Sequence, residues 1–120
     1  MVNYHISDHD LDDRTRLISL GGEPDLYTAP RFEDALRQAL DAGKRRIVID
    51  LSEATFIDST TLAVIVAGSK RLSAAGGELA LVCSHRAVMR VFEITGYDRL
   101  FSICASRDEA VRALADAPSG

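Results

Sequence analysis

Apolar residues along the chain follow two alternating patterns, short β-branched runs and longer segments with apolar positions at helical spacing. Runs of about five residues indicate strands, whereas apolar residues three and four positions apart indicate helices. Strands are predicted at residues 2–6, 16–20, 46–51, 78–83 and 100–104. Helices are predicted from Thr28 to a stop at Gly43, from residue 58 to Gly76-Gly77, from Ser84 to Gly96, and from a capping box at Ser106 and Glu109 through Leu114.

The order of these segments predicts an α/β fold with a mixed, mostly parallel sheet of about five strands and about four helices. Two strands come first, flank the acidic turn 8–13 and form an antiparallel pair. Each later strand follows a helix, which is typical of parallel neighbours. If the strands at 46–51 and 78–83 are such neighbours, the loop at 56–58 lies at the carboxyl end of the sheet, where α/β proteins place their sites.

Residues 54–68 read ATFIDSTTLAVIVAG, and their type is ambiguous from periodicity alone. Val64-Ile65-Val66 would also suit a strand. The pattern continues to residue 75, about 16 residues in all, which is too long for an ordinary strand. We therefore expect a helix whose first half is apolar on every side and lies against the sheet.

Length and charge narrow the function classes. The 120 residues suit one domain over 1–120, with a core at about 2–115 and a frayed tail at 116–120. The net charge of −4 and the scattered basic residues argue against a nucleic-acid partner. The first residues do not resemble a signal peptide, and no apolar run is long enough to span a membrane, which predicts a cytoplasmic protein without membrane insertion.

The two cysteines, Cys83 and Cys104, stand alone near the ends of two apolar runs. They lack the Cys-x-x-Cys spacing of metal and redox sites, so we expect buried free thiols.

Asp58, Ser59, Thr60 and Thr61 place four short oxygen-bearing side chains directly before an apolar run. Asp58 or Ser59 can cap the helix, because either accepts hydrogen bonds from the free amides of the first turn. One cap needs one side chain, so some of the hydroxyls are expected to point outward. An exposed hydroxyl at a helix N-terminus is a plausible phosphate acceptor, because the amides and the helix dipole favour the dianion.

A hydrolase triad of Ser59, Asp25 and a histidine is one enzymatic alternative. The Gly-x-Ser-x-Gly elbow is absent, and the histidines occupy the opening strand, the turn after it and a helix start, at His5, His9 and His85. The glycine-rich loops that bind nucleotides are absent as well. We therefore expect no enzymatic activity, no cofactor and no metal site.

A phosphoacceptor aspartate, as in receiver domains, is the second alternative. Asp58 would accept the phosphate, and Asp12 and Asp13 would offer the acidic pair for Mg²⁺. Such a domain also needs a lysine near the end of its last strand, whereas here Arg99 is the only base before that strand. Two strands at the start also depart from strict alternation, so the pattern disfavours this alternative.

Four segments resemble motifs of the STAS domain family, the anti-sigma factor antagonists of bacteria. Residues 56–62, FIDSTTL, resemble its phosphorylation motif Phe-x-Asp-Ser-Ser/Thr-Gly-Leu, and residues 22–25, GEPD, resemble its Gly-Glu-Leu-Asp turn. Residues 76–82 and 88–96 resemble its Gly-Gly-strand and its Val-x-x-x-Phe-x-x-x-Gly helix. The segments follow the family order across roughly residues 15–115, which makes the match far more specific than any single motif.

The resemblance implies a STAS-type fold that acts by partner switching in sigma factor regulation, without catalysis of its own. The unmodified protein would bind an anti-sigma factor with serine kinase activity, be released by phosphorylation, and be reset by a PP2C-type phosphatase. By position, Ser59 would be the phosphoacceptor, with Thr60 as a second candidate. The partner-binding residues would be Asp25, Asp58, Ser59, Thr60 and Thr61.

Two residues depart from the family motifs: Thr61 stands in place of the glycine, and Pro24 in place of the leucine. Thr61 adds a β-branched side chain beside the acceptor, which would either hinder a kinase or mark a relative that uses this surface without phosphorylation. The alternative function is therefore a non-catalytic STAS subunit that docks on the ATPase of a lipid transporter.

Overall fold

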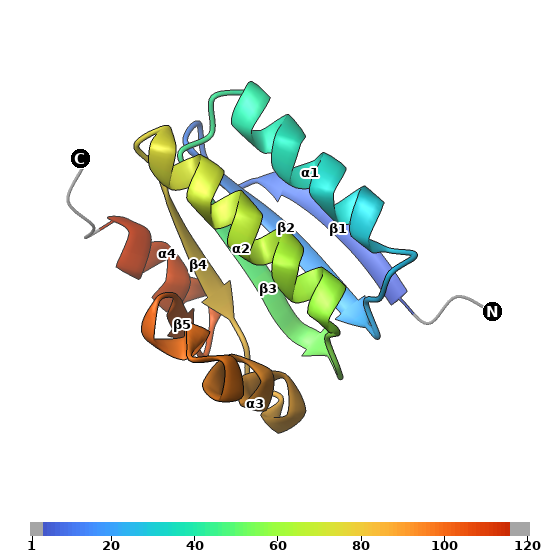
Figure 1. Cartoon of the computed structure of the whole chain (residues 1–120). Coiled ribbons are helices and arrows are strands. Elements are labelled where there is room, and N and C mark those ends of the chain that lie inside the picture. Colours follow the sequence, from blue (N-terminus) through green and yellow to red (C-terminus); the bar gives the residue numbers. More distant parts are fainter. Residues whose placement is uncertain (1–3, 116–120) are drawn as a thin grey trace.

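The structure, a computed structural model, describes residues 4–115 as five strands, four α-helices and one 3₁₀ helix (Figure 1). The strands are β1 (Tyr4–Asp10), β2 (Thr15–Gly22), β3 (Arg46–Ala54), β4 (Glu78–Val82) and β5 (Ser102–Cys104). The helices are α1 (Ala29–Asp41), α2 (Ser59–Ala74), α3 (Arg86–Thr95), η1 (Tyr97–Arg99) and α4 (Arg107–Ala115). The predicted tail at 116–120 and the start of the first predicted strand lie outside the described residues.

The strands form one sheet in sequence order, β1-β2-β3-β4-β5. β1 is antiparallel to β2, and the pairs β2-β3, β3-β4 and β4-β5 are parallel. This confirms the predicted α/β fold with an antiparallel pair at its start. Because β2, β3 and β4 run in the same direction, the loops that follow them lie along one edge of the sheet, the carboxyl edge.

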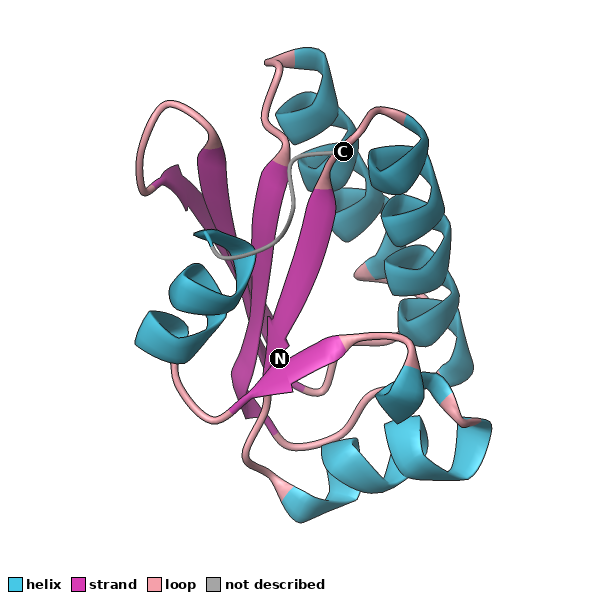
Figure 2. Ribbon diagram, turned by 90° about the vertical axis from the view of Figure 1, so that its left-hand side faces the viewer, coloured by secondary structure: helices cyan, strands magenta, loops and turns pink. Residues whose placement is uncertain are grey.

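Helices cover both faces of the sheet, as Figure 2 shows: α1 and α2 pack on one face and α4 on the other. Successive residues of β3 therefore enter different cores, because side chains alternate along a strand. Ile47 and Ile49 lie in the core beneath α1 and α2, whereas Val48 packs with Ala110 and Leu114 of α4. Burial on both faces explains why β3 reads as a continuous apolar run.

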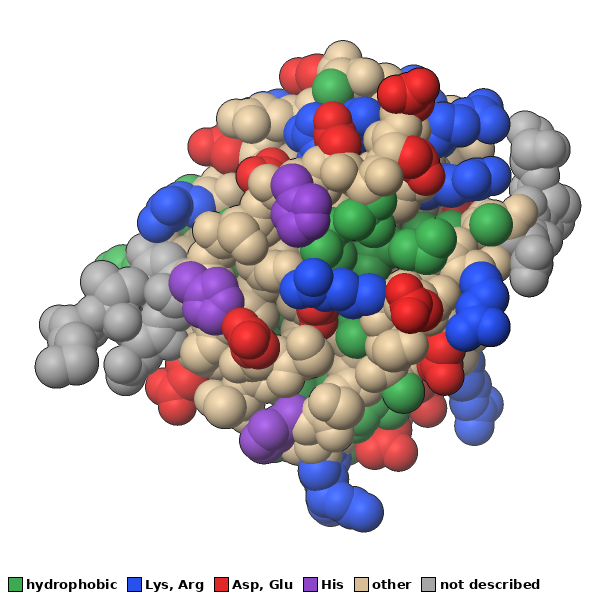
Figure 3. All heavy atoms as spheres, turned by 180° about the vertical axis from the view of Figure 1, so that it is seen from behind, with side chains coloured by type: hydrophobic (Ala, Val, Ile, Leu, Met, Phe, Trp, Pro, Cys, Tyr) green, Lys and Arg blue, Asp and Glu red, His purple; other side chains and the backbone are tan. Residues whose placement is uncertain are grey.

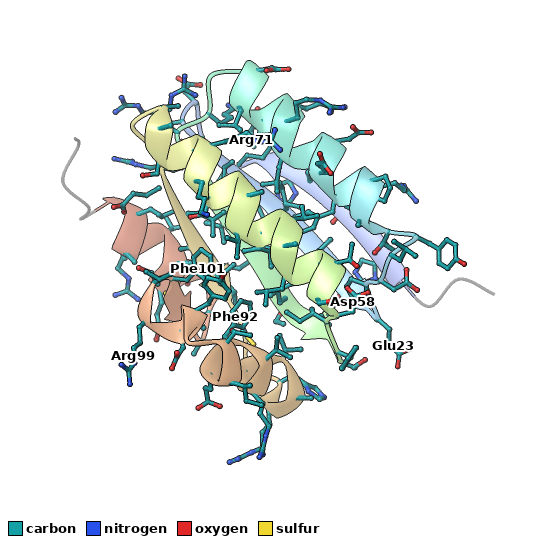
Figure 4. The ribbon with its side chains drawn as sticks, viewed as in Figure 1. Glu23, Asp58, Arg71, Phe92, Arg99 and Phe101 are labelled. Carbon is teal, nitrogen blue, oxygen red and sulfur yellow. The ribbon has the colours of Figure 1, made fainter. Side chains whose placement is uncertain are left out.

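Helix α3 ends where the sequence predicts, at Gly96, whose φ of 79° is the left-handed conformation that glycine adopts at low cost. The chain then forms η1, so β5 begins at Ser102 rather than at the predicted residue 100. Phe92 of α3 meets Phe101 edge to face, with ring centroids 6.2 Å apart (Figure 4). This contact packs α3 against the segment that follows η1.

Several predicted boundaries were wrong. β1 ends at Asp10 rather than at residue 6, and β2 spans Thr15–Gly22 rather than 16–20. Ser84 does not cap α3; the cap is His85, whose Nδ1 accepts a hydrogen bond from the Ala87 N–H at 3.3 Å. β3 continues past residue 51 to Ala54, because Glu53 and Ala54 still pair with β2 beyond a bulge, where β3 contains one more residue than β2. The apolar run ends earlier than the strand, so the sequence pattern alone underestimated its length.

The two thiols are free, and only one of them is fully buried. Cys83 is buried, as predicted, whereas Cys104 at the end of β5 is half-buried. Burial raises the pKa of both thiols, so neither has the lowered pKa of a reactive cysteine. Within residues 4–115, no helix is both long and apolar enough to cross a membrane.

Candidate functional site at the start of helix α2

Two loops meet at the carboxyl edge of the sheet, one between β2 and α1 and one between β3 and α2. Gly22 and Ala54, the last residues of the two strands, are partners in the parallel ladder. The Thr55 N–H donates to the Gly22 carbonyl oxygen at 2.8 Å, which joins the two loops directly. The loop that precedes Ser59 and the loop that contains Asp25 are therefore neighbours, although they are more than thirty residues apart.

Asp58 caps helix α2. Its backbone is extended, with φ −98° and ψ 177°, and its Oδ1 accepts a hydrogen bond from the Thr61 N–H at 2.9 Å. Ser59 is the first helical residue and is exposed to solvent. The two candidates for the cap are thus distinguished: Asp58 holds the helix start, and Ser59 presents its side chain at the surface.

Asp25 forms hydrogen bonds within the neighbouring loop, which joins β2 to α1. Its Oδ1 accepts hydrogen bonds from the backbone N–H groups of Tyr27 at 2.9 Å and Thr28 at 3.3 Å. The Thr28 hydroxyl accepts from the Asp25 N–H at 2.8 Å and donates to the Asp25 carbonyl oxygen at 2.9 Å. Thr28 precedes α1 as predicted, but its side chain makes no capping bond and instead closes this loop.

Thr60 and Thr61 face different environments. Thr60 is half-buried and lines a groove between α1 and α2. Thr61 is only 1% exposed, because it shares the sheet-facing side of α2 with Ile65, Gly68 and Leu72. The expectation that Thr61 would contact a partner at the surface is therefore wrong for its side chain.

The buried hydroxyl of Thr61 is also unsatisfied. Among the residues that the structure describes, its Oγ1 is the buried polar side-chain atom without a hydrogen-bond partner. Burying such a group costs about 1–3 kcal/mol. The start of α2 therefore contains a locally unfavourable residue at the position where the family motif has glycine.

Two grooves flank helix α2, each with a volume of about 370 Å³. The groove toward α1 is mostly apolar and is lined by Leu26, Pro30, Thr60, Ala63, Ala67 and Arg71 among others. The groove on the opposite side, toward η1, is lined by Ser59, Leu62, Ala63, Val66, Lys70 and Tyr97 among others. Ser59 and Thr60 thus line grooves on opposite sides of the same helix.

Exposed apolar side chains in the two loops were missed by sequence reasoning. Leu26 is 62%, Tyr27 80% and Phe56 49% exposed. Leu26 and Tyr27 lie in a turn with no periodicity, so the sequence pattern gave no reason to assign them to core or surface. The available signal was a leucine and a tyrosine side by side between a turn-forming Asp25 and a helix start.

The structure does not place His5 or His9 beside Ser59, as a catalytic triad would require. The third histidine, His85, caps α3, and its Nδ1 accepts a backbone hydrogen bond there. His5 and His9 of β1 pair with Gly21 and Leu17 of the neighbouring strand β2. Directly paired residues of two strands project from the same face of the sheet. Leu17 belongs to the core under α4, so both histidines lie on that face, opposite α2. Figure 3 views this back of the molecule and shows histidine side chains on it.

The residues of a receiver-type site are also separated. Asp12 and Asp13 lie in the turn before β2, at the amino edge of the sheet, whereas Asp58 lies at the carboxyl edge. Figure 4 shows Arg99 pointing outward on the opposite side of the molecule from Asp58. Within residues 4–115, no cluster of three or more histidine, cysteine or acidic side chains could hold a metal ion.

The sequence matches the family model of the STAS domain over residues 8–110. It is 34% identical over 86 residues to the anti-sigma-B factor antagonist of Staphylococcus aureus, and the match covers 72% of this chain and 80% of that protein. The fold is similar to the crystal structure of an anti-sigma factor antagonist from Mycobacterium paratuberculosis, with a TM-score of 0.84 and 29% identity over 94% of this chain and 95% of the other. The phosphorylated form of SpoIIAA from Bacillus has the same fold, with a TM-score of 0.74 and 20% identity over 91% of this chain and 98% of that chain.

Proposed function

Since the chain belongs to the STAS domain family, we propose that it is an anti-sigma factor antagonist whose binding is controlled by phosphorylation of Ser59. The unmodified protein binds an anti-sigma factor with serine kinase activity and thereby frees a sigma factor. The kinase transfers the γ-phosphoryl group of ATP to the Ser59 hydroxyl, the serine proton is lost, ADP leaves, and the complex dissociates. A PP2C-type phosphatase hydrolyses the phosphoester and restores the binding form.

One observation carries the phosphorylation step: Ser59 is exposed at the first position of α2, while Asp58 caps the helix. The serine hydroxyl is therefore not required to hold the helix start. A phosphate at this position would be stabilised by the free amides and by the positive end of the helix dipole. Modification of Ser59 is thus compatible with the fold of the free protein.

The acidic surroundings explain how phosphate would weaken binding. Phosphorylation adds a charge of about −1.5 to −2 at pH 7. Asp58 is the adjacent residue, and the Asp25 loop borders the start of α2, because Leu26 and Thr60 line the same groove. Like charges brought together in a desolvated interface repel, and a loss of about 2 to 3 kcal/mol weakens binding by about 30- to 150-fold.

Thr61 does not argue against phosphorylation. Its side chain is buried on the sheet-facing side of α2, whereas Ser59 is exposed. The extra methyl and hydroxyl groups therefore do not cover the acceptor. The substitution of glycine affects the interior of the helix start rather than the approach of a kinase.

The test compares three baits in pull-downs from the lysate of the native host: wild type, Ser59→Glu and Ser73→Glu. Ser73 is exposed on the same helix but far from its N-terminus, so it is a matched control for added charge. We expect wild type and Ser73→Glu to retain an anti-sigma factor, identified by mass spectrometry, and Ser59→Glu to lose it.

Two results would count against the proposal. If Ser59→Glu retains the anti-sigma factor as well as wild type does, Ser59 is not the switch. If all three baits retain the ATPase of a lipid transporter instead, the protein is a docking subunit. Incubation of the purified protein with the retained anti-sigma factor and ATP then tests the chemistry, since a Ser59→Ala variant should not incorporate phosphate.

A further inference from the structure

The groove on the side of α2 that faces η1 has a volume of about 370 Å³, within the range of small-molecule sites, about 300–1,000 Å³. Its lining residues on α2 recur every three or four positions from Ser59 to Lys70, so they form one stripe along the helix. The small side chains of Ala63 and Ala67 leave this stripe hollow, and Tyr97 lines the groove from η1. We name it the η1 groove.

The wall opposite α2 is held in place by aromatic contacts. Tyr97 lies against Phe101, with ring centroids 5.9 Å apart, and Phe101 meets the buried Phe92 of α3 edge to face. Figure 4 shows Phe92 and Phe101 on the α3 side of α2. The η1 groove is therefore formed before any ligand binds, which reduces the entropy that binding loses.

Lys70 is the one charged residue among those that line the η1 groove. It is exposed at one end of the stripe, and within residues 4–115 it forms no ion pair. The groove toward α1 differs, because its two charged residues, Glu33 and Arg71, pair with each other at 3.9 Å. Of the two grooves, the η1 groove thus presents a positive charge that no carboxylate of the described chain neutralises.

An apolar groove with a cation at one end is complementary to an apolar molecule with an anionic head group. The length of the η1 groove selects a chain. Ser59 and Lys70 are eleven positions apart, which at the rise of an α-helix is a distance of about 16 Å. An alkyl carboxylate as long as dodecanoate spans such a distance when it is extended.

We propose that the η1 groove binds a free alkyl carboxylate of medium chain length, with its carboxylate at Lys70 and the end of its chain at Ser59. The binding does not depend on the proposed function, but its consequence rests on it. A bound chain covers the Ser59 side chain and hinders its phosphorylation. Conversely, phosphate on Ser59 places a dianion against the apolar end of the chain and weakens binding.

The first test is calorimetric titration of the purified protein with dodecanoate, octanoate and dodecyltrimethylammonium, all below the concentrations at which they form micelles. We expect dodecanoate to bind, and octanoate to bind about tenfold more weakly, because fewer methylene groups are buried. The protein has a net charge of −4, so non-specific attraction favours the cation, whereas the η1 groove favours the carboxylate. Binding of the cation as tight as that of dodecanoate, or no binding of dodecanoate, would overturn the inference.

The second test removes the positive charge. Lys70→Gln is compared with Arg71→Gln, which removes a charge at the next residue, exposed on the same helix but lining the other groove. We expect the Kd for dodecanoate to rise about fivefold for Lys70→Gln and less than about twofold for Arg71→Gln. Equal changes in the two variants would show that Lys70 does not hold the carboxylate.

The third test examines the other end of the groove. Ser59→Glu adds a charge where the chain is proposed to end, and Ser73→Glu adds the same charge at an exposed position of α2 outside the η1 groove. We expect Ser59→Glu to weaken dodecanoate binding about fivefold and Ser73→Glu to leave it unchanged. If Ser59→Glu binds dodecanoate as wild type does, the chain does not lie against Ser59. Circular dichroism of each variant confirms that a loss of binding is not a loss of folding.

The consequence for phosphorylation is measured with the purified anti-sigma factor that wild type retains. We expect saturating dodecanoate to slow phosphate incorporation into wild type, and to slow it less in Lys70→Gln at the same concentration. If no phosphate is incorporated even without dodecanoate, the proposed function fails, and the binding measurements alone decide the inference. If dodecanoate leaves the rate unchanged, or slows both proteins equally, the proposed function stands and the inference is overturned.

Discussion

Two Ile-Asp pairs, Ile49-Asp50 and Ile57-Asp58, lie eight residues apart in the sequence, and their aspartates have different structural roles. Asp50 lies inside strand β3 and is 3% exposed, whereas Asp58 is half-buried and caps helix α2 at the surface. The first aspartate contributes to the stability of the fold, and the second belongs to the candidate site.

The polar groups around Asp50 satisfy one another. Its Oδ1 accepts from the Ser52 N–H at 2.9 Å, and its Oδ2 accepts from Arg107 Nε of helix α4 at 2.5 Å. Arg107 also donates to the Ser19 hydroxyl at 3.3 Å. The start of α2 is different, because Ser59 is exposed and the Thr61 hydroxyl has no partner within the described residues. Side-chain hydroxyls that make no hydrogen bond are thus found at the candidate site, whereas the groups around Asp50 are hydrogen-bonded to one another.

The largest expected effect comes from Asp50→Ala. This change removes the acceptor of both the Ser52 amide and the Arg107 guanidinium, so we expect the free energy of unfolding to fall by about 2 to 3 kcal/mol. Urea denaturation measures the change. Asp8→Ala, at an exposed position of β1, is the control and should change stability by less than about 0.5 kcal/mol. Equal effects of the two substitutions would show that the buried cluster is not stabilising.

The next largest effect should come from two threonines that are both 1% exposed. Thr28 makes two hydrogen bonds through its hydroxyl, and Thr61 makes none. Valine has nearly the same shape, so Thr61→Val should raise the free energy of unfolding by about 1 kcal/mol, whereas Thr28→Val should lower it by about 1 to 2 kcal/mol. Thermal denaturation of both variants measures the opposite signs. A loss of stability in Thr61→Val would mean that its hydroxyl is satisfied in solution.

The order of strands and helices was predictable from the sequence because it depends on local periodicity. The apolar run at 46–51 and the glycines at 43, 76 and 96 mark where strands and helices begin and end. Asp58 was predictable as a cap only as an alternative to Ser59, since both side chains suit the position chemically. The backbone geometry at the helix start decides between them.

The remaining features depend on contacts between distant residues. The pairing of Asp50 with Arg107 joins residues 57 positions apart, and no local pattern indicates it. The burial of Thr61 follows from the rotation of α2 against the sheet, which the all-apolar first half of that helix does not specify. The exposed apolar side chains Leu26, Tyr27 and Phe56 belong to two loops that become neighbours only after the sheet forms.

Asp58→Ala should have a smaller effect on stability than Asp50→Ala. Loss of a helix cap costs about 1 kcal/mol, because the Thr61 N–H loses its hydrogen bond to the Asp58 side chain. Asp58→Asn keeps an oxygen acceptor and should cost only a few tenths of a kcal/mol. Thermal denaturation compares the three proteins. If Asp58→Ala lowers the free energy of unfolding as much as Asp50→Ala does, the two aspartates contribute equally to stability, which contradicts this prediction.

The smallest expected effect is a change in pH dependence. Burial tends to raise the pKa of Asp50, but the hydrogen bonds from Ser52 and the charge of Arg107 outweigh it and hold that pKa below the ordinary value of 3.8. The unfolded chain therefore binds this proton more readily, so the stabilisation is complete well above pH 3.8 and is lost as pH falls through the folded pKa. The difference in free energy of unfolding between wild type and Asp50→Asn should be constant from about pH 5 to 7 and shrink below about pH 4. Other carboxylates titrate in both proteins and cancel, so a difference that widens in acid would mean that Asp50 is not held ionised by these contacts.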